Sequence, residues 1–203
     1  MNITVNEELL AYIDPLTPEE NEALERSLLA EGCRDALVLW GDVLVDGHNR
    51  YRLCTQHGIP FNTVQNTRFT SIDDVHLWMI EQHLGRRSVS DFQRGVLALR
   101  RKDILTARMK SAPAEVSGSQ APAVSGKPEL VPTMGAIAKS ARISNATLHQ
   151  IEKIQKSAAP ELVAAVKSGT LSINAAASVA SLPMQAQVAA VAGGKKELQQ
   201  AAR

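Results

Sequence analysis

The segment that most constrains the fold lies near the middle of the chain, from Ser111 to Glu129, and reads SAPAEVSGSQAPAVSGKPE. It consists mainly of Ser, Ala, Pro and Gly and has almost no bulky apolar side chain. Such a segment cannot bury enough apolar surface to offset the entropy lost on ordering, so we expect a flexible linker. The chain has 203 residues, which allows a separate domain on each side of this linker.

Before the linker, short apolar runs alternate with helical patterns, which predicts an α/β or α+β domain. In LTPEENEALERSLLAEG, Thr17 and Glu20 suit a capping box and Gly32 is placed to end the helix. The apolar face of that helix is predicted to contain Leu24, Leu28 and Leu29. The run DALVLWGDVLVDG predicts a hairpin that turns at Gly-Asp, RYRLCTQHG a short helix, and PFNTVQNTRF a third strand.

From Ile72 onward the patterns predict helices, with Ser71 as the first cap. The domain organisation expected from the sequence is an α/β domain over residues 1–72, a helical extension over 73–110, the linker over 111–130, an all-α domain over 131–183 and a tail over 184–203.

The composition excludes several classes of protein. With 22 Lys and Arg residues against 21 Asp and Glu residues, the chain is nearly neutral, so any DNA binding must be local. Seven aromatic residues are too few for a stacking platform for single-stranded nucleic acid. Cys33 and Cys54 have no metal or disulfide spacing and are interpreted as small buried residues in a reducing environment. Since the sequence has no signal-peptide pattern and no long apolar run, we expect a cytoplasmic protein that does not contact membranes.

The segment PTMGAIAKSARISNATLHQIEKI, after the linker, has the pattern of a helix-turn-helix. If Ala138 is the small residue where two helices cross, the apolar and small positions of that motif are occupied by Ile137, Ala141, Ile143, Leu148 and Ile151. One position differs, because Arg142 occupies a turn position that usually holds a left-handed glycine. An ordinary helical hairpin without DNA contact is the alternative.

Ser144 would cap the second helix, whose outward residues suit a DNA major groove. Asn and Gln side chains can pair with adenine edges, and Thr and Ala can contact thymine methyl groups. The predicted DNA-contacting residues are Lys139, Arg142, Ser144, Asn145, Thr147, His149 and Gln150.

In VDGHNRYRLC, an apolar strand leads into a loop with the features of a phosphate site. Gly47 would let the backbone approach a phosphate group and Arg50 would balance its charge, while Asp46 or His48 could help to hold a metal or position water. A turn followed by a surface arginine remains the alternative, and a lone histidine is not a metal site.

Further along, WMIEQHLGRRSVSDFQR places Glu81 ahead of Arg86 and Arg87. A carboxylate able to bind Mg²⁺ therefore lies close to charges able to bind phosphate. The alternative is a solvated, charged helix end.

Taken in order, these segments resemble the ParB N-terminal domain family of the ParB/sulfiredoxin superfamily. The resemblance covers Leu9 to Phe92 and continues weakly through the helix-turn-helix into APELVAAVKSGTLSINAAASVASLP. The motifs DPLTPEE, LWGDVLVDGHNRYRLC and WMIEQHLGRR are similar to those of ParB-domain proteins from plasmids and bacterial mobile elements. The fold it implies is α+β: a ParB/sulfiredoxin-like N-terminal domain followed by an all-α helix-turn-helix domain.

The resemblance also implies ligands and roles. CTP would be gripped by a Gly-x-x-Arg motif at Gly47 and Arg50, and Mg²⁺ by Glu81, with Gln82 in place of the family's asparagine. Glu81 would be the catalytic residue of a weak CTPase, and CTP would switch a homodimer between open and clamped forms around double-stranded DNA. The nucleotide-binding residues implied in this way are Gly47, His48, Asn49, Arg50, Gln82, Arg86 and Arg87.

Two departures affect this expectation. The family's Gly-Glu-Arg-Arg is replaced here by Gly-His-Asn-Arg and its Gln-Pro-Arg by Leu-Thr-Pro, so fewer cations face a triphosphate. The leading hypothesis is a DNA-binding, nucleotide-switched regulator, or a partition or accessory factor, of a plasmid or integrative element, with a partner protein from the same element. The alternatives are a nucleotide hydrolase, phosphotransferase or nuclease that uses Asp46, His48 and Glu81, and an interaction adaptor without a ligand.

Overall fold

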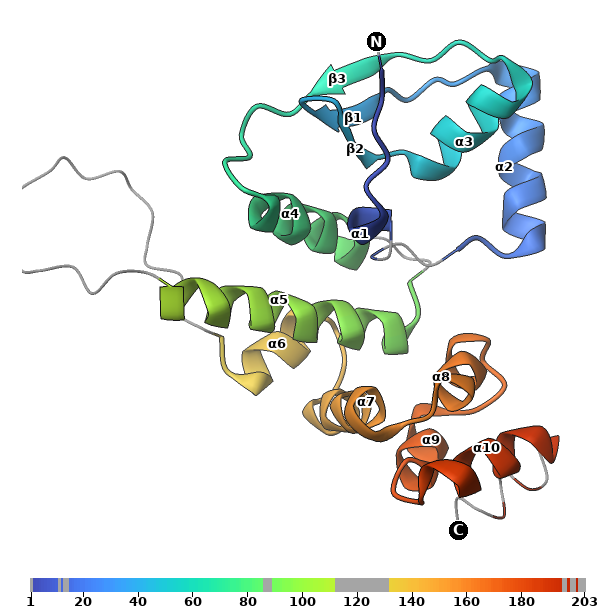
Figure 1. Cartoon of the computed structure of the whole chain (residues 1–203), viewed down its shortest axis with the longest axis vertical. Helices are drawn as coiled ribbons and strands as arrows, with labels where there is room; N and C mark the ends of the chain where they lie inside the picture. The colour runs from blue at the N-terminus through green and yellow to red at the C-terminus, as the bar shows by residue number, and fades with distance from the viewer. Residues whose placement is uncertain are drawn as a thin grey trace, which may run out of the picture. The chain divides into compact units, whose positions relative to one another are not determined.

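The computed structural model of the chain describes residues 2–10, 12, 15–85, 89–111, 132–194, 197 and 200 (Figure 1). It separates into two compact units, Met1–Gln82 and His83–Arg203. This division falls inside the stretch that the sequence pattern assigned to a helical extension, 73–110. Apart from Ser111, the predicted linker over 111–130 lies outside the described residues.

The first unit contains a three-stranded sheet in the order β2-β1-β3. Strands β1 (Leu37–Trp40) and β2 (Val43–Asp46) are antiparallel and pair Trp40 with Val43, as expected for the hairpin. Strand β3 (Thr63–Gln65) runs parallel to β1 and is shorter than its sequence pattern predicted. A parallel pair needs a crossover connection, and the chain between β2 and β3 supplies it as helix α3 (His48–His57).

Short helix α1 (Glu7–Leu10) precedes α2 (Pro18–Glu31), which begins with the predicted capping box. Thr17 Oγ1 accepts from the Glu20 N–H at 3.2 Å, and Glu20 Oε2 accepts from the Thr17 N–H at 2.9 Å. Gly32 ends the helix at φ 73°. The prediction for Leu29 was wrong: it is 58% exposed, because α2 packs through Leu28 onto the cluster that contains Cys54.

Helices cover both faces of the sheet. Successive strand residues point to opposite faces, and Leu37, Leu39 and Leu44 lie in one buried cluster with Tyr51 of α3. The other face, which carries Val45, packs with Val75 and Met79 of α4 (Ile72–Gly85). The sheet therefore lies between α3 and α4, and the turn from β2 into α3 is anchored on both sides.

The second unit is entirely helical among its described residues. Its helices are α5 (Asp91–Ser111), α6 (Met134–Ser140), α7 (Asn145–Ser157), α8 (Pro160–Lys167), α9 (Ile173–Val179) and α10 (Met184–Ala192). They share one core of alanines, larger aliphatic side chains and Phe92. Gly95 of α5 lets α7 pack closely, since a Cβ there would lie 2.3 Å from Ile151 Cδ1.

One buried polar side chain joins α10 to its neighbours. Gln187 is 1% exposed, and its Oε1 accepts from the Ala159 N–H at 2.7 Å. Its Nε2 donates to the carbonyl oxygens of Ser157 and Leu182, at 3.0 and 2.8 Å. These bonds satisfy backbone groups at helix ends, which lack partners within their own helices. In the part of the chain that the structure describes, no helix is long and apolar enough to span a membrane.

Candidate functional sites: a glycine–arginine loop and a helix pair

The first candidate site is the turn between β2 and α3. Gly47 is the N-cap of α3 and has φ 94° and ψ 22°, a left-handed conformation. A Cβ at this position would lie 2.5 Å from Leu37 Cδ2 and 3.1 Å from Arg50 Nη2. Both the backbone angle and the space therefore require glycine. This requirement places a helix N-terminus beside an arginine side chain, an arrangement suited to anions.

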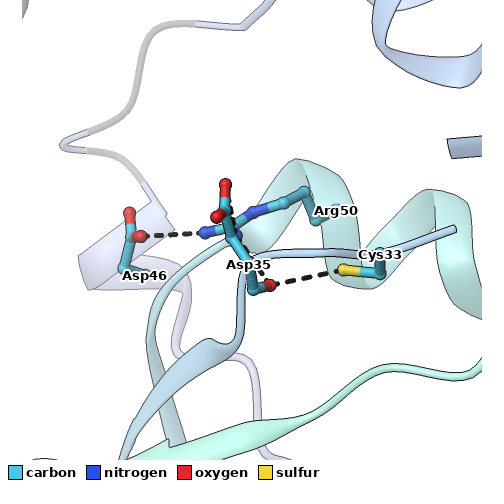
Figure 2. A network of polar contacts seen from close by, with 4 residues as sticks. All are labelled: Cys33, Asp35, Asp46 and Arg50. Carbon is cyan, nitrogen blue, oxygen red and sulfur yellow. Dashed lines mark hydrogen bonds and ion pairs between the residues drawn. The ribbon is translucent and has the colours of Figure 1, made fainter. Parts of the chain in front are cut away.

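Arg50 is held by acidic residues (Figure 2). Its Nη2 donates to Asp46 Oδ2 at 3.0 Å, and its Nη1 donates to the carbonyl oxygen of Asp35 at 2.9 Å. The Asp35 carboxylate lies 3.7 Å from Nη1, and the Arg50 side chain is only 19% exposed. A phosphate group would therefore bind Arg50 by displacing contacts that already exist. The pairing with Asp46 could be anticipated from its spacing of four residues on the chain, whereas nothing in the sequence indicated Asp35.

His48 is the first residue of α3 and is 6% exposed. Neither ring nitrogen has a hydrogen-bond partner. Burial lowers the pKa of His48, and the neighbouring Asp46 carboxylate opposes this by favouring the charged ring. Since an ordinary histidine pKa is about 6.5, the buried ring is neutral at pH 7. Asn49, the remaining residue of the predicted loop, is half-buried.

The two cysteines are free thiols close to this site. Cys33 Sγ donates to the same Asp35 carbonyl oxygen that Arg50 contacts, at 3.5 Å (Figure 2). Burial, followed by the neighbouring Cys33 thiol, raises the pKa of Cys54 to about 11. The Cys54 thiol is therefore protonated at neutral pH and unreactive, which agrees with its interpretation as a packing residue.

Glu81 and Gln82 are exposed in the last turns of α4. Met79, two residues before Glu81, packs in the same cluster as Val45 of β2, so this end of α4 belongs to the unit that contains the loop. Arg86 and Arg87 lie outside the described residues. Within the described ranges, no group of three or more His, Cys, Asp or Glu side chains could hold a metal ion.

The second candidate site is formed by α6 and α7 and the turn between them. Each helix has its hydroxyl cap: Thr133 Oγ1 accepts from the Ala136 N–H at 3.3 Å, and Ser144 Oγ accepts from the Thr147 N–H at 3.0 Å. The positions that the sequence pattern required to be apolar or small are buried or partly buried: Ile137, Ala138, Ala141, Ile143, Leu148 and Ile151.

Arg142 has φ 57°, and it is the one non-glycine residue with positive φ in the described ranges. The left-handed turn that the sequence pattern required is therefore present, although an arginine occupies it. A β-carbon in this conformation costs about 1–2 kcal/mol. The strained residue places a positively charged side chain at the turn between α6 and α7.

Most of the predicted DNA-contacting side chains are accessible on this helix pair. The exposed ones are Lys139, Arg142, Ser144, Asn145 and His149. Thr147 is half-buried, and its hydroxyl lies 2.8 Å from that of Ser144. Gln150 is also half-buried, and its Nε2 donates to Asn174 Oδ1 of α9 at 2.9 Å. Gln150 thus faces α9 as well as the surface, a contact that the sequence pattern did not indicate.

The charges of the two units have opposite signs. Residues 83–203 contain 17 Lys and Arg residues against 7 Asp and Glu residues, a formal net charge of +10. Residues 1–82 contain 5 against 14, a net charge of −9. The near neutrality of the chain conceals this division, which became visible only when the boundary between the units was known.

The chain matches no protein-family model and no curated protein. Its fold, however, is that of ParB N-terminal domains. A solved structure of a Pnob8-like ParB-N domain, in its C2221 form, aligns over 89% of this chain and 76% of its own, with a TM-score of 0.56 and 14% identity. A structure of the pNOB8-like ParB N-domain aligns over 89% of this chain and 71% of its own, with a TM-score of 0.53 and 16% identity.

A third solved structure is the C-terminally truncated chromosome-partitioning protein ParB from Caulobacter crescentus, complexed to the centromeric parS site. It aligns over 99% of this chain and 95% of its own, at 14% identity, but its TM-score of 0.47 is too low to add to the assignment of the fold.

Proposed function

We propose that this chain binds double-stranded DNA through α6 and α7. The observation that carries the proposal is the exposed polar first turn of α7, set on a capped helix pair with a left-handed turn, in a unit of net charge +10. The similarity of the fold to ParB N-terminal domains also supports a DNA-binding function. In this arrangement Asn145, His149 and Gln150 would face base edges in the major groove. Lys139 and Arg142 would contact phosphates.

Fluorescence anisotropy with a random-sequence duplex tests the phosphate contacts. Lys139→Ala and Arg142→Ala should each weaken binding, whereas Lys156→Ala should not, because Lys156 lies in the last turn of α7 and pairs with Glu152 at 2.7 Å. Equal losses in all three variants would contradict the assignment of this surface.

Selection of a preferred duplex from a random pool then tests base recognition. Asn145→Ala and Gln150→Ala should each reduce discrimination between preferred and random duplexes by about 1–3 kcal/mol if the side chain makes a bidentate base contact. Unchanged discrimination would exclude α7 as the recognition helix. We also propose a homodimer that binds paired half-sites, as such readers usually do; a monomer by sedimentation with DNA bound would contradict it.

A second proposed function is binding of a nucleotide triphosphate, CTP in the first instance, at the loop between β2 and α3. The observation in its favour is the left-handed conformation of Gly47, the N-cap of α3, which lets the backbone lie close to the Arg50 guanidinium. Glu81 is the residue that would help to hold Mg²⁺ beside a nucleotide, since the described residues contain no group of three or more His, Cys, Asp or Glu side chains able to hold it alone. Bound there, it would neutralise phosphate charge.

Calorimetric titration with CTP, ATP and GTP in the presence of Mg²⁺ tests this site. Arg50→Ala should abolish saturable binding, whereas Arg52→Ala is the matched control, since Arg52 lies on the same helix but bonds Asn21 of α2. If no nucleotide binds the native chain, the loop retains the shape of the fold without a ligand. We propose further that a bound nucleotide switches DNA binding, and that the protein acts as a regulator or partition factor of a plasmid or integrative element.

A further inference from the structure

Gln150 of α7 is held by a side chain from a different helix. Its Nε2 donates to Asn174 Oδ1 of α9 at 2.9 Å. On α7 itself, the residue four positions earlier is Ala146, which has no polar side chain, and the Thr147 hydroxyl lies 2.8 Å from that of Ser144. In the part of the chain that the structure describes, Asn174 therefore fixes the direction in which the Gln150 amide points.

The helix that carries Asn174 is firmly anchored. It begins at the Ser172 cap, whose Oγ accepts from the Ala175 N–H at 3.3 Å. Ala176 of α9 and Ile151 of α7 are both fully buried in the same core. Close packing of this kind resists displacement of one helix against the other. The exposed Asn174 side chain is therefore presented at a defined place beside α7.

The bond to Asn174 leaves the Gln150 amide with one donor and one acceptor. A primary amide has two N–H donors and one carbonyl oxygen. When one N–H is donated to Asn174, the other N–H and the carbonyl oxygen remain available to a ligand. Adenine presents the complementary pair in the major groove, an N7 acceptor and an N6 donor, whereas guanine presents two acceptors. The free groups of Gln150 thus match adenine better than guanine.

Asn174 also disfavours the reversed orientation of Gln150. A half-turn of the Gln150 amide exchanges its nitrogen and its oxygen, so that two carbonyl oxygens would face each other. Neither of these oxygens can donate a hydrogen bond. Without Asn174 the amide could take both orientations, and its nitrogen could then donate to guanine acceptors.

We propose that Asn174 is a positioning residue for base recognition, which orients the Gln150 amide so that α7 reads an adenine in one base pair of the DNA site. This inference rests on the proposed DNA-binding function of α6 and α7, and it names a base that the proposed function leaves open. Asn174 acts through Gln150 and does not itself contact the base.

The base pair that Gln150 reads is identified first. Anisotropy titrations of the full chain compare the preferred duplex, obtained by selection, with duplexes in which one base pair at a time is substituted. The pair read by Gln150 is the one at which Gln150→Ala loses its preference while the other positions keep theirs. The native chain should prefer A·T to G·C at this pair by about five- to 150-fold, the range for a bidentate contact.

The role of Asn174 is then tested at that pair. Asn174→Ala should reduce the preference for A·T by about two- to tenfold, as expected for the loss of one hydrogen bond, and should leave binding to a random duplex unchanged. Asn174→Asp retains an acceptor and should keep the preference, although its negative charge lowers the affinity for every duplex. Ser181→Ala is the matched control: it removes a second polar contact of α7, the bond from Lys153 Nζ, and should leave the preference unchanged.

Four results would overturn the positioning role: native preference in Asn174→Ala, an equal loss in Ser181→Ala, an equal loss in Asn174→Asp, or a base pair other than A·T at the position that Gln150 reads. Nuclear Overhauser contacts between the two side-chain amides, measured in the native protein bound to the preferred duplex, test the bond without any variant, and their absence would overturn the role as well.

The same data separate this inference from the proposed function. Loss of preference in Gln150→Ala together with native preference in Asn174→Ala would leave α7 as the recognition helix and exclude only the role of Asn174. If the native chain prefers no duplex over another, or if Gln150→Ala keeps every preference, base recognition by Gln150 and its positioning by Asn174 would both be wrong.

Discussion

Arg142 combines strain and charge at a single residue. Its φ of 57° places a β-carbon in the left-handed region, where L-residues lose about 1–2 kcal/mol relative to glycine. A residue retained in such a conformation is a candidate for a functional role rather than a stabilising one.

We therefore predict opposite effects of Arg142→Gly on stability and on DNA binding. The free energy of unfolding should rise by about 1 kcal/mol, because the strain is relieved, while DNA affinity should fall with the lost cation. Arg142→Ala is the control, since it removes the charge but retains the β-carbon. Chemical unfolding and anisotropy on both variants measure the two effects, and a glycine variant no more stable than the alanine variant would contradict the strain.

His48 predicts how stability depends on pH in the absence of ligand. Burial lowers its pKa in the folded chain, so below the unfolded value of about 6.5 the unfolded chain takes up a proton that the folded chain does not. Stability is therefore retained above that pH and falls as the pH decreases, by at most about 1.4 kcal/mol per pH unit from this residue. Urea unfolding at pH 7.5 and 5.5 should show a smaller acid loss in His48→Gln than in the native chain.

The sequence carried more information about single residues than about their long-range partners. The capping box of Thr17 and Glu20 and the left-handed turn at Arg142 were predicted correctly, because caps and turns depend on neighbours within a few positions. Asp35 was missed because its contact with Arg50 spans 15 residues and depends on how the loop before β1 meets α3. The local sequence pattern therefore identified the loop between β2 and α3. Only the folded structure showed that acidic residues hold Arg50.

At the scale of elements, helices α5 and α7 pack closely against each other at Gly95. A glycine inside a long helix lowers the helix propensity, and nothing in the helical pattern indicates that Gly95 marks a crossing. The fold explains it: Ile151 is fully buried and occupies the space that a side chain at Gly95 would take.

Gly95→Ala should lower the free energy of unfolding by about 1–3 kcal/mol, because overpacking a filled core outweighs the better helix propensity of alanine. Gly135→Ala in α6 is the matched control. No atom lies within 4 Å of a Cβ built there, so alanine should stabilise by up to about 1 kcal/mol. Thermal and chemical unfolding of both variants should give shifts of opposite sign, and two stabilising shifts would show that the crossing is loosely packed.

Gln187 shows a second limit of sequence patterns for helices. Its residue type is typical of a polar surface position, yet it is 1% exposed and bonds to the ends of other helices. Its partners Ser157 and Ala159 lie 30 and 28 residues earlier in the chain, at the junction between α7 and α8, and periodicity within α10 could not identify them. Buried polar residues of this kind follow from tertiary packing.

At the scale of the whole molecule, the two units carry net charges of opposite sign and therefore favour different ligands. A net charge of +10 in residues 83–203 favours a polyanion such as DNA. A net charge of −9 in residues 1–82 disfavours anionic ligands except at a specific cationic site. The sequence-based expectation that DNA binding must be local therefore agrees with the distribution of charge.

DNA affinity should fall steeply with salt, since each phosphate contact releases counterions. Lys139→Ala should reduce the slope of log K against log salt by about 1 if it contacts one phosphate. Arg34→Ala, an exposed arginine of the first unit that pairs with Glu31, should leave the slope unchanged. Anisotropy titrations across a salt series measure both, and equal slopes for all proteins would contradict a phosphate contact at Lys139.

The division of charge also determines how the protein meets charged surfaces. A chain of net charge +1 with evenly mixed charges would be retained weakly on any ion exchanger. Here, at a single pH, the negatively charged first unit can bind an anion exchanger and the positively charged second unit can bind a cation exchanger. The chain should therefore be retained on both resins. The first unit would determine the salt concentration at which the chain elutes from the anion exchanger, and the second unit the concentration at which it elutes from the cation exchanger.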